Sequence, residues 1–289
     1  MALQLVAFFE NNGCFTSSQF GFRKGKNTTL GILNLVTEIM DSSESLEHNA
    51  VLFCDLSKAF DCVSHSLLLK KLKFYKFSAT SIQLIHSYLA DRTQVVKVGG
   101  VSSAERVIDI GVPQGSVLGP ILFLIYVNDL PFNGGTENFT LFADDTTISL
   151  ASDNVDEVRI GLGDVESSAK AWFAANELIL NEQKTNMMIF SLRNMDNHIQ
   201  GTPAVKFLGL QIDNLLRWDV HIDCLCKRLN SAVFAIRNLS RSVSVDVLRT
   251  AYYALFHSLM SYGVLIWGHA AQAERVFKLQ RRVIRILRV

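Results

Sequence analysis

Two β-prone arms enclose a pair of aspartates in the segment 139–150, FTLFADDTTISL. The arms are rich in the β-branched and aromatic residues that strands favour, so the segment predicts a hairpin with Asp144 and Asp145 at its tip. A third carboxylate, Asp55, ends the apolar run 49–55, which we expect to be a short buried strand. The sequence therefore predicts a sheet in which a strand-end aspartate faces a hairpin-tip pair.

Helices and strands are expected to alternate along the rest of the first 215 residues. Ser64 is expected to cap an amphipathic helix whose inner face carries three leucines, Leu67, Leu68 and Leu72. The other expected elements are strands at 95–98 and 106–110 joined by a Gly99-Gly100 turn, an almost wholly apolar helix to about Asn128, a helix from Val155 to Trp172, a strand at 186–190 and a hairpin at 205–213. This order indicates an α+β fold, with an antiparallel sheet that carries helices on one face.

Beyond about residue 215 the sequence becomes helical and basic. The apolar periodicity predicts helices at 219–239, 245–259 and 273–287, the last of them amphipathic. Residues 217–289 hold 12 Lys/Arg against 4 Asp/Glu, a charge of +8, whereas the first 216 residues hold 16 against 23, a charge of −7. A basic segment joined to an acidic body fits a nucleic-acid grip beside a metal-binding carboxylate centre.

Several classes of protein are disfavoured by the composition. The longest apolar run, 117–127, is shorter than the roughly 20 residues of a membrane span, so we expect no membrane partner. Five cysteines without framework spacing fit reduced thiols in an intracellular protein, with nucleus or cytoplasm left open. His221, Cys224 and Cys226 cluster, but one C-x-C without a second ligand pair does not lead us to assign zinc.

The three aspartates fit the chemistry of nucleotidyl transfer. Joining a nucleotide to a primer requires an activated 3′-hydroxyl and stabilisation of phosphate charge, which two Mg²⁺ ions about 3.5–4 Å apart provide. Mg²⁺ prefers carboxylate oxygens, and Mn²⁺ is a possible substitute. Any lone aspartate in a turn is more simply a cap or turn residue. The surroundings of Asp55, Asp144 and Asp145 favour the metal site instead.

The ordered motifs resemble the reverse transcriptase domain of non-LTR retrotransposons, of the jockey-like and CR1-like sort, from about residue 14 to the end. The matching segments are 19–23 (QFGFR), 55–61 (DLSKAFD, motif A), 111–116 (GVPQGS, motif B), 142–145 (FADD, motif C), 181–185 (NEQKT, motif D), 207–209 (FLG, primer grip) and the later pairs at 262–263 and 267–268. Motif C has Phe142 where tyrosine is commoner. The resemblance implies a right-hand polymerase palm at 49–215, a helical, basic thumb-like region at 216–289 and residual fingers at 1–48.

The resemblance also implies individual roles. Asp55, Asp144, Asp145 and the Leu56 carbonyl would hold metal. The residues expected at the nucleotide are Leu56, Lys58, Phe60, Gln114 and Lys184, with the Phe60 ring under the sugar to exclude a 2′-hydroxyl. The residues expected at template and primer are Arg23, Lys24, Lys26, Gly209, Lys278, Arg281, Arg282 and Arg285. The partners implied are an RNA template, a DNA primer and dNTPs, with the oligomeric state open.

Each of these roles has a plainer alternative. Phe60 could be core packing, Gln114 part of a helix-entry turn and Lys184 a solvated lysine. The basic run at 23–26 could be solvated, and the last helix could be a surface helix awaiting a partner.

Two further functions remain open beside RNA-directed DNA polymerase. Because the family carries finger segments before motif A, we expect this chain to be a piece of an element, and a non-catalytic nucleic-acid-binding remnant is the second hypothesis. A third is an assembly module that engages partners through its C-terminal helices.

Overall fold

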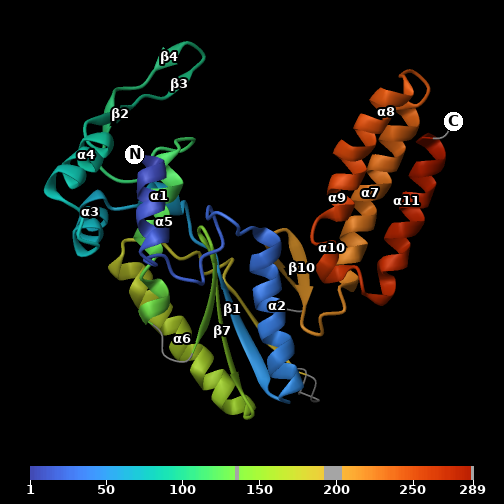
Figure 1. Ribbon diagram of the computed structural model, residues 1–289, viewed down its shortest axis with the longest axis horizontal. Helices are drawn as coiled ribbons and strands as arrows, with labels where there is room; N and C mark the ends of the chain where they lie inside the picture. The colour runs from blue at the N-terminus through green and yellow to red at the C-terminus, as the bar shows by residue number, and fades with distance from the viewer. Residues whose placement is uncertain (134–136, 192–203, 288–289) are drawn as a thin grey trace. The chain divides into compact units, whose positions relative to one another are not determined.

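The computed structural model describes residues 1–133, 137–191 and 204–287 (Figure 1). The chain folds into two compact units. We call residues 1–35 and 47–187 the first unit, and residues 36–46 and 188–289 the second unit. The chain passes between them three times: inside helix α2 (Thr28–Glu44), between Leu46 and Glu47, and inside strand β8 (Asn186–Phe190).

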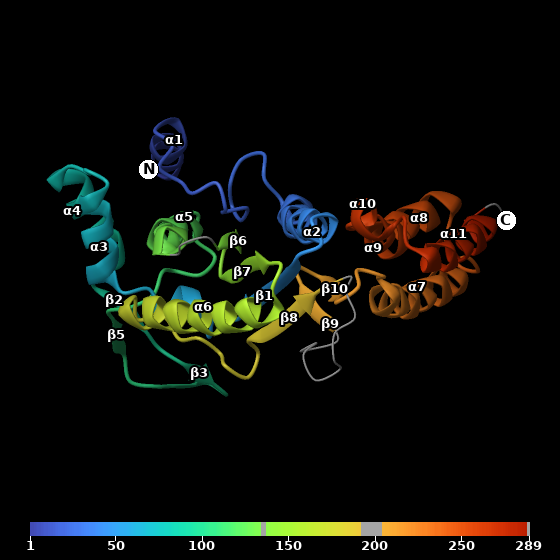
Figure 2. The ribbon, with the colours of Figure 1, turned by 90° about the horizontal axis from the view of Figure 1, so that it is seen from below.

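Three neighbouring strands of one sheet, in the order β6-β7-β1, organise the first unit. Strands β6 (Asn138–Phe142) and β7 (Asp145–Ser152) form an antiparallel hairpin, and β7 pairs antiparallel with β1 (His48–Cys54). The predicted strand at 49–55 and the hairpin at 139–150 are therefore confirmed. All seven residues of β1 are buried, so both faces of this strand are covered. Helix α6 (Val155–Ala175) packs against β1 and β7 (Figure 2).

The helices of the first unit follow their apolar patterns. Helix α5 (Leu118–Val127) has eight buried residues among its ten, as its nearly continuous apolar sequence predicts. Helix α3 (His65–Phe74) buries Leu68 and Leu72. The cap expected from Ser64 is wrong in one respect, because its hydroxyl pairs with Ser66 Oγ at 3.2 Å and caps no backbone N–H. The remaining helices are α1 (Ala2–Asn11) and α4 (Ala79–Leu89), with short 3₁₀ turns η1 (Ala59–Cys62) and η2 (Leu130–Asn133).

The strand pairing predicted for residues 95–110 is wrong. Strand β3 (Lys97–Val98) pairs with β4 (Val101–Ser102), while β2 (Arg92–Gln94) pairs with β5 (Arg106–Ile108). Gly99 and Gly100 both have positive φ, at 56° and 85°, so the chain reverses within two residues and pairs Val98 with Val101. The segment 106–108 is then left to pair with residues 92–94.

The second unit joins a hairpin to a group of helices. Its elements are β9 (Ala204–Phe207), β10 (Leu210–Asp213), α7 (Asp219–Leu239), α8 (Val245–Ala251), a π-helical stretch (Tyr252–His257), α9 (Ser258–Ser261), α10 (Val264–Trp267), η4 (Ala271–Ala273) and α11 (Glu274–Leu287). The predicted hairpin and helices are confirmed, although a π-helical stretch interrupts the second helix. Asp213 holds the segment that leads into α7, because its carboxylate accepts the N–H groups of Arg217 at 2.9 Å and Trp218 at 2.7 Å. No helix within the described ranges is long and apolar enough to cross a membrane.

His221 is a buried histidine on the inner face of α7. Its side chain is 7% exposed, Nδ1 accepts a long 3.5 Å hydrogen bond from the Gln211 N–H, and the ring lies 5.9 Å from that of Trp267. Burial, and after it the charge of Arg228, lowers the pKa of His221 from 6.5 to about 4. The imidazole is therefore neutral at physiological pH.

This neutral histidine should make the second unit sensitive to acid. The unfolded chain binds a proton at His221 below about pH 6.5 and the folded chain only below about pH 4, so stability is lost as the pH falls between these values. We expect this residue to remove about 2 kcal/mol from the free energy of unfolding between pH 7 and pH 5. Urea titrations followed by tryptophan fluorescence should show a shallower pH dependence in His221→Gln than in the exposed-site control His269→Gln. Equal pH dependence in the two variants would contradict this origin.

Candidate active site

Asp55 and Asp144 meet at one end of the first unit's sheet. Cys54 pairs with Thr146, so Asp55 directly follows β1 where β7 begins beside it. Asp144 shares the tip of the β6–β7 hairpin with Ala143, whose φ of 57° lies in the left-handed region. Burial raises the pKa of Asp144 above its usual 3.8, and the negative charge of Asp55 raises it further. The two carboxylates thus lie within electrostatic reach of each other.

This carboxylate pair suits a hard cation. Two like charges within electrostatic reach of each other, one of them half-buried, are costly unless a positive charge joins them, and carboxylate oxygens are the ligands that Mg²⁺ prefers. Asp145 is the first residue of β7 and is exposed. Within the described ranges, no three His, Cys, Asp or Glu side chains lie close enough together to form a metal site by themselves. In the described ranges the structure therefore does not gather the three predicted aspartates into one cluster, and Asp55 and Asp144 are the two that interact.

The loop that carries Lys184 is hydrogen-bonded to the strand end at Asp55. The Asn181 N–H donates to the Asp55 carbonyl at 2.8 Å, and the Ser57 N–H donates to the Ile179 carbonyl at 2.8 Å. Lys184 Nζ lies 3.6 Å from Asp55 Oδ2, with both side chains substantially exposed. Sequence reasoning placed Lys184 near the site but missed the part that Asn181 plays in holding it there.

The loop 111–116 lies against the segment that follows Asp55. The Val112 N–H donates to the Phe60 carbonyl at 2.8 Å, and the Gly111 N–H donates to the Val63 carbonyl at 2.7 Å. Gln114 Nε2 donates to Asp61 Oδ1 at 2.8 Å. These bonds hold the loop 111–116 against the segment 60–63, and the Gln114 side chain remains exposed.

Two side chains expected at the nucleotide have different surroundings. The Phe60 ring stacks on Phe123 of α5, with centroids 4.4 Å apart and planes at 22°. Lys58 is exposed and has a left-handed φ of 49°, and it is the residue directly before the turn that contains Phe60. Leu56 is buried next to Asp55. The aromatic stack fixes the place of Phe60 whether or not a sugar lies on it.

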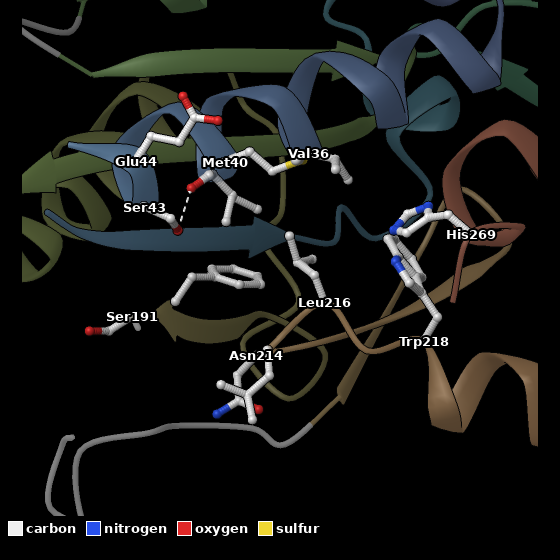
Figure 3. A pocket seen from close by; sticks show the side chains of 12 residues that line it. Val36, Met40, Ser43, Glu44, Ser191, Asn214, Leu216, Trp218 and His269 are labelled. Atoms are coloured by element: carbon white, nitrogen blue, oxygen red, sulfur yellow. Dashed lines mark hydrogen bonds between the residues drawn. The ribbon is translucent and has the colours of Figure 1, made fainter. Parts of the chain in front are cut away.

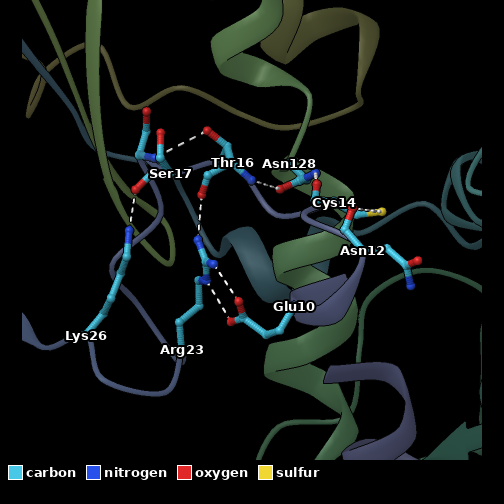
Figure 4. A network of polar contacts seen from close by, with 9 residues as sticks. Glu10, Asn12, Cys14, Thr16, Ser17, Arg23, Lys26 and Asn128 are labelled. Carbon is cyan, nitrogen blue, oxygen red and sulfur yellow. Dashed lines mark hydrogen bonds and ion pairs between the residues drawn. The ribbon is translucent and has the colours of Figure 1, made fainter. Parts of the chain in front are cut away.

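The basic run at 23–26 is largely occupied by contacts within the first unit. Arg23 donates to both carboxylate oxygens of Glu10, at 2.9 and 2.6 Å, and to the Thr16 carbonyl at 2.6 Å (Figure 4). This pairing lowers the pKa of Glu10. Lys26 donates to the Ser17 carbonyl, and its Nζ lies 4.2 Å from the centre of the Phe20 ring. Lys24 is the exposed member of the three.

In the second unit, Gly209 forms the turn between β9 and β10. Its φ is 90°, and a Cβ added there would lie 3.1 Å from the ring of Tyr262. The Tyr262 hydroxyl donates to the Leu208 carbonyl, and Trp267 Nε1 donates to the Tyr262 carbonyl at 2.9 Å. The aromatic residues that follow α9 therefore hold this turn. Sequence reasoning noted Tyr262 and Trp267 only as motif residues.

The basic residues of α11 lie on its exposed face. Glu274 forms ion pairs with Lys278 at 3.3 Å and Arg281 at 3.6 Å. Arg282 and Arg285 are exposed and have no acidic partner among the described residues. Val276 and Val283 are buried on the opposite side. This helix offers positive charge to solvent.

A pocket of about 300 Å³ lies within the second unit, and none of the three predicted catalytic aspartates lines it (Figure 3). Its walls come from the second half of α2, the end of β8, the segment before α7 and His269, and its lining is mostly apolar. The residues that line it are Val36, Ile39, Met40, Ser43, Glu44, Phe190, Ser191, Asn214, Leu215, Leu216, Trp218 and His269. With no lysine or arginine to meet a phosphate, it is a poor nucleotide site.

Comparison with known proteins gives a consistent result. Residues 2–212 match the family described as Reverse transcriptase (RNA-dependent DNA polymerase). The chain is 30% identical over 291 residues to the probable RNA-directed DNA polymerase from transposon BS of Drosophila melanogaster, covering 93% of this chain and 32% of that protein. It is 28% identical over 291 residues to the RNA-directed DNA polymerase from mobile element jockey of the same species, covering 92% of this chain and 31% of that protein.

The chain thus spans about a third of the length of these curated relatives. Among solved structures, apo telomerase from Candida Tropicalis matches with a TM-score of 0.55 and 15% identity, over 98% of this chain and 50% of that one. At this level of identity the match shows a shared fold.

Proposed function

This chain belongs to the reverse transcriptase (RNA-dependent DNA polymerase) family, and from that premise we propose that it is the catalytic part of a non-LTR retrotransposon's RNA-directed DNA polymerase. The observation that carries the proposal is the meeting of Asp55 and Asp144 at one end of the sheet. The motif order and the match to jockey support it. The proposed reaction is transfer of dNTPs to a DNA primer on an RNA template.

Asp55 and Asp144, with Asp145 and the Leu56 carbonyl, are the residues we propose as metal ligands. Two Mg²⁺ ions held there would supply the charge that activates the primer hydroxyl and stabilises the pyrophosphate. Lys184, 3.6 Å from Asp55, is placed to protonate or neutralise the leaving group. The hydrogen bond from the Asn181 N–H to the Asp55 carbonyl keeps the loop that carries Lys184 beside Asp55.

The nucleotide is proposed to lie over the loops that hold Lys58, Phe60 and Gln114. Lys58 is exposed and free to meet the triphosphate, while Gln114 lies at the surface of the loop 111–116. The stack on Phe123 fixes the Phe60 ring, and a fixed ring under the sugar would exclude a 2′-hydroxyl. The structure therefore supports core packing and substrate selection by the same side chain.

The second unit is proposed to bind the primer–template duplex, as the primer grip and thumb of the right-hand fold. The Gly209 turn is held by Tyr262. The exposed basic face of α11 would contact phosphates without reading sequence, as expected for a protein that tracks an A-form backbone. Lys24 is the residue of the 23–26 run best placed to do the same in the first unit, because Arg23 and Lys26 already have internal partners.

Primer extension by the purified chain tests this proposal. On poly-rA with oligo-dT, dTTP and Mg²⁺, we expect stepwise extension, with Mn²⁺ as a working substitute. Binding of the same duplex should weaken steeply with salt, because phosphate neutralisation releases counterions. Salt-dependent binding without extension under either metal would count against catalysis and favour the non-catalytic nucleic-acid binder.

A further inference from the structure

Gln19 contacts the aspartate-bearing hairpin from outside the sheet. We propose that it is a positioning residue, which holds the turn 142–145 so that Asp144 faces Asp55. The effect of this positioning on catalysis rests on the proposed function. Gln19 itself touches neither the carboxylates nor, in the proposed reaction, any substrate.

The first observation is the hydrogen bonding of the Gln19 side chain, which is only 1% exposed. Its Oε1 accepts the backbone N–H of Ala143 at 3.0 Å and that of Gly21 at 2.8 Å. The bond to Ala143 therefore joins two residues that are 124 positions apart in the sequence. This N–H belongs to the peptide group between Phe142 and Ala143, so the bond fixes the orientation of the backbone one residue before Asp144.

The backbone around Gln19 adds a second layer of contact. The Phe20 N–H donates to the Leu141 carbonyl at 2.7 Å, and the Leu141 N–H donates to the Ser18 carbonyl at 2.9 Å. Gln19 and Leu141 form a parallel bridge. The segment 18–20 thus pairs with β6 through one isolated bridge, and the Gln19 side chain continues the contact to the hairpin tip.

Ala143 depends on this acceptor more than an ordinary turn residue would. It is buried and adopts a φ of 57°, a left-handed conformation that costs a residue with a Cβ about 1–2 kcal/mol. Losing Gln19 would also leave its buried N–H without a partner, which costs roughly 1–3 kcal/mol. The turn would then relax toward other conformations, and Asp144 would move with it.

Gly21 provides an independent observation of the same contact. A Cβ added at Gly21 would lie 2.5 Å from the Ala143 nitrogen and 3.1 Å from the Phe142 carbonyl carbon. Real side chains are not accommodated at such distances. The segment QFGFR therefore approaches the FADD turn so closely that only glycine fits, while glutamine supplies the acceptor.

The geometry also says which atom of Gln19 matters. Both groups that face Oε1 are N–H donors, so this atom is the amide oxygen. Nε2 is buried and has no partner among the described residues. A substitution that keeps the oxygen should therefore preserve the role, and one that removes it should not.

The test compares Gln19→Met, which keeps the length but loses the acceptor, with Gln19→Glu, which keeps an acceptor oxygen as the neutral acid that burial at this site favours. The matched control is Asn128→Leu, because Asn128 is also buried and bridges the backbone of the same segment, accepting from the Thr16 N–H at 3.0 Å and donating to the Cys14 carbonyl at 2.7 Å (Figure 4). Each intact variant is titrated with Mn²⁺ by electron paramagnetic resonance. Primer-extension kcat and KM and the urea midpoint are measured alongside.

We expect Gln19→Met to weaken Mn²⁺ binding and lower kcat by about 10-fold or more, the size typical of losing a residue that orients a metal ligand, with little change in KM for dTTP. Gln19→Glu should recover most of both losses. Asn128→Leu should lower the urea midpoint and leave Mn²⁺ affinity unchanged.

Equal Mn²⁺ affinity in Gln19→Met and the wild type would overturn the positioning role, as would an equal loss in Asn128→Leu or a failure of Gln19→Glu to recover. A wild-type chain that binds Mn²⁺ but extends no primer would overturn the proposed function alone, because the affinities still report on Gln19. A wild-type chain that binds no Mn²⁺ would overturn both.

Discussion

Replacing Asp144 with asparagine is expected to lower the rate of primer extension by about 10³-fold or more, without unfolding the chain. Asparagine keeps the size of the side chain and one oxygen, but it removes the negative charge that a divalent cation requires. The fold should gain stability from the same change. Burial and the Asp55 charge raise the pKa of Asp144, so its ionised form penalises the folded state.

The change of this penalty with pH allows a second measurement. For a carboxyl with a raised pKa, the penalty appears as the pH rises through the unfolded value near 3.8 and is complete above the folded value. Asp144→Asn should therefore lose less stability than the wild type between pH 3.5 and pH 7 in urea titrations. Asp164→Asn, an exposed position on α6, is the matched control and should change neither activity nor this pH dependence. Extension that survives Asp144→Asn would contradict the assignment.

Gly111→Val is expected to destabilise the first unit by about 2–5 kcal/mol and to abolish extension with it. Gly111 has a φ of 83°, and a Cβ there would lie 2.8 Å from the Asp61 carbonyl oxygen and 2.9 Å from the Asp61 Cα. Valine would thus add backbone strain and a clash against backbone atoms that cannot swing away. The hydrogen bond from Gln114 to Asp61 would be lost as the loop moved.

Gly100→Val separates these two causes. Gly100 has nearly the same φ, 85°, but nothing lies within 4 Å of a Cβ added there. Gly100→Val should show the cost of backbone strain alone. Gly111→Val should therefore lower the free energy of unfolding in urea by about 1–3 kcal/mol more than Gly100→Val does. Equal losses in the two variants would show that the approach to Asp61 is not tight.

The sequence predicted best where one local pattern decides the structure. The apolar run 49–55, the arms around Asp144 and the helix at 219–239 carry strong periodicity, and each element lies where it was expected. The predicted strand pairing in the segment 92–108 was wrong because its strands are short, exposed and weakly patterned. Their register depends on the tight turn at Gly99 and Gly100.

The parts of the site that sequence reasoning missed depend on distant partners. Nothing local to Arg23 shows that its guanidinium pairs with Glu10. Nothing local to Gln19 shows that it reaches Ala143. Such contacts exist only after the segments have packed, and they need a buried acceptor or donor that a one-dimensional pattern does not reveal. The roles proposed for the metal and nucleotide residues stay predictions.

The motifs around the carboxylates are joined chiefly through main-chain atoms: Val112 to Phe60, Asn181 to Asp55 and Phe20 to Leu141. Main-chain bonds do not depend on the identity of the side chains. Outside positions such as Gln19, Gly21 and Gly111, whose side chain or lack of one the contacts require, distant copies of such an element can therefore drift in residue type and keep the geometry. Adding or deleting one residue inside a motif would shift every bond after it, so copies should accumulate length changes in the connecting loops and almost none within these segments.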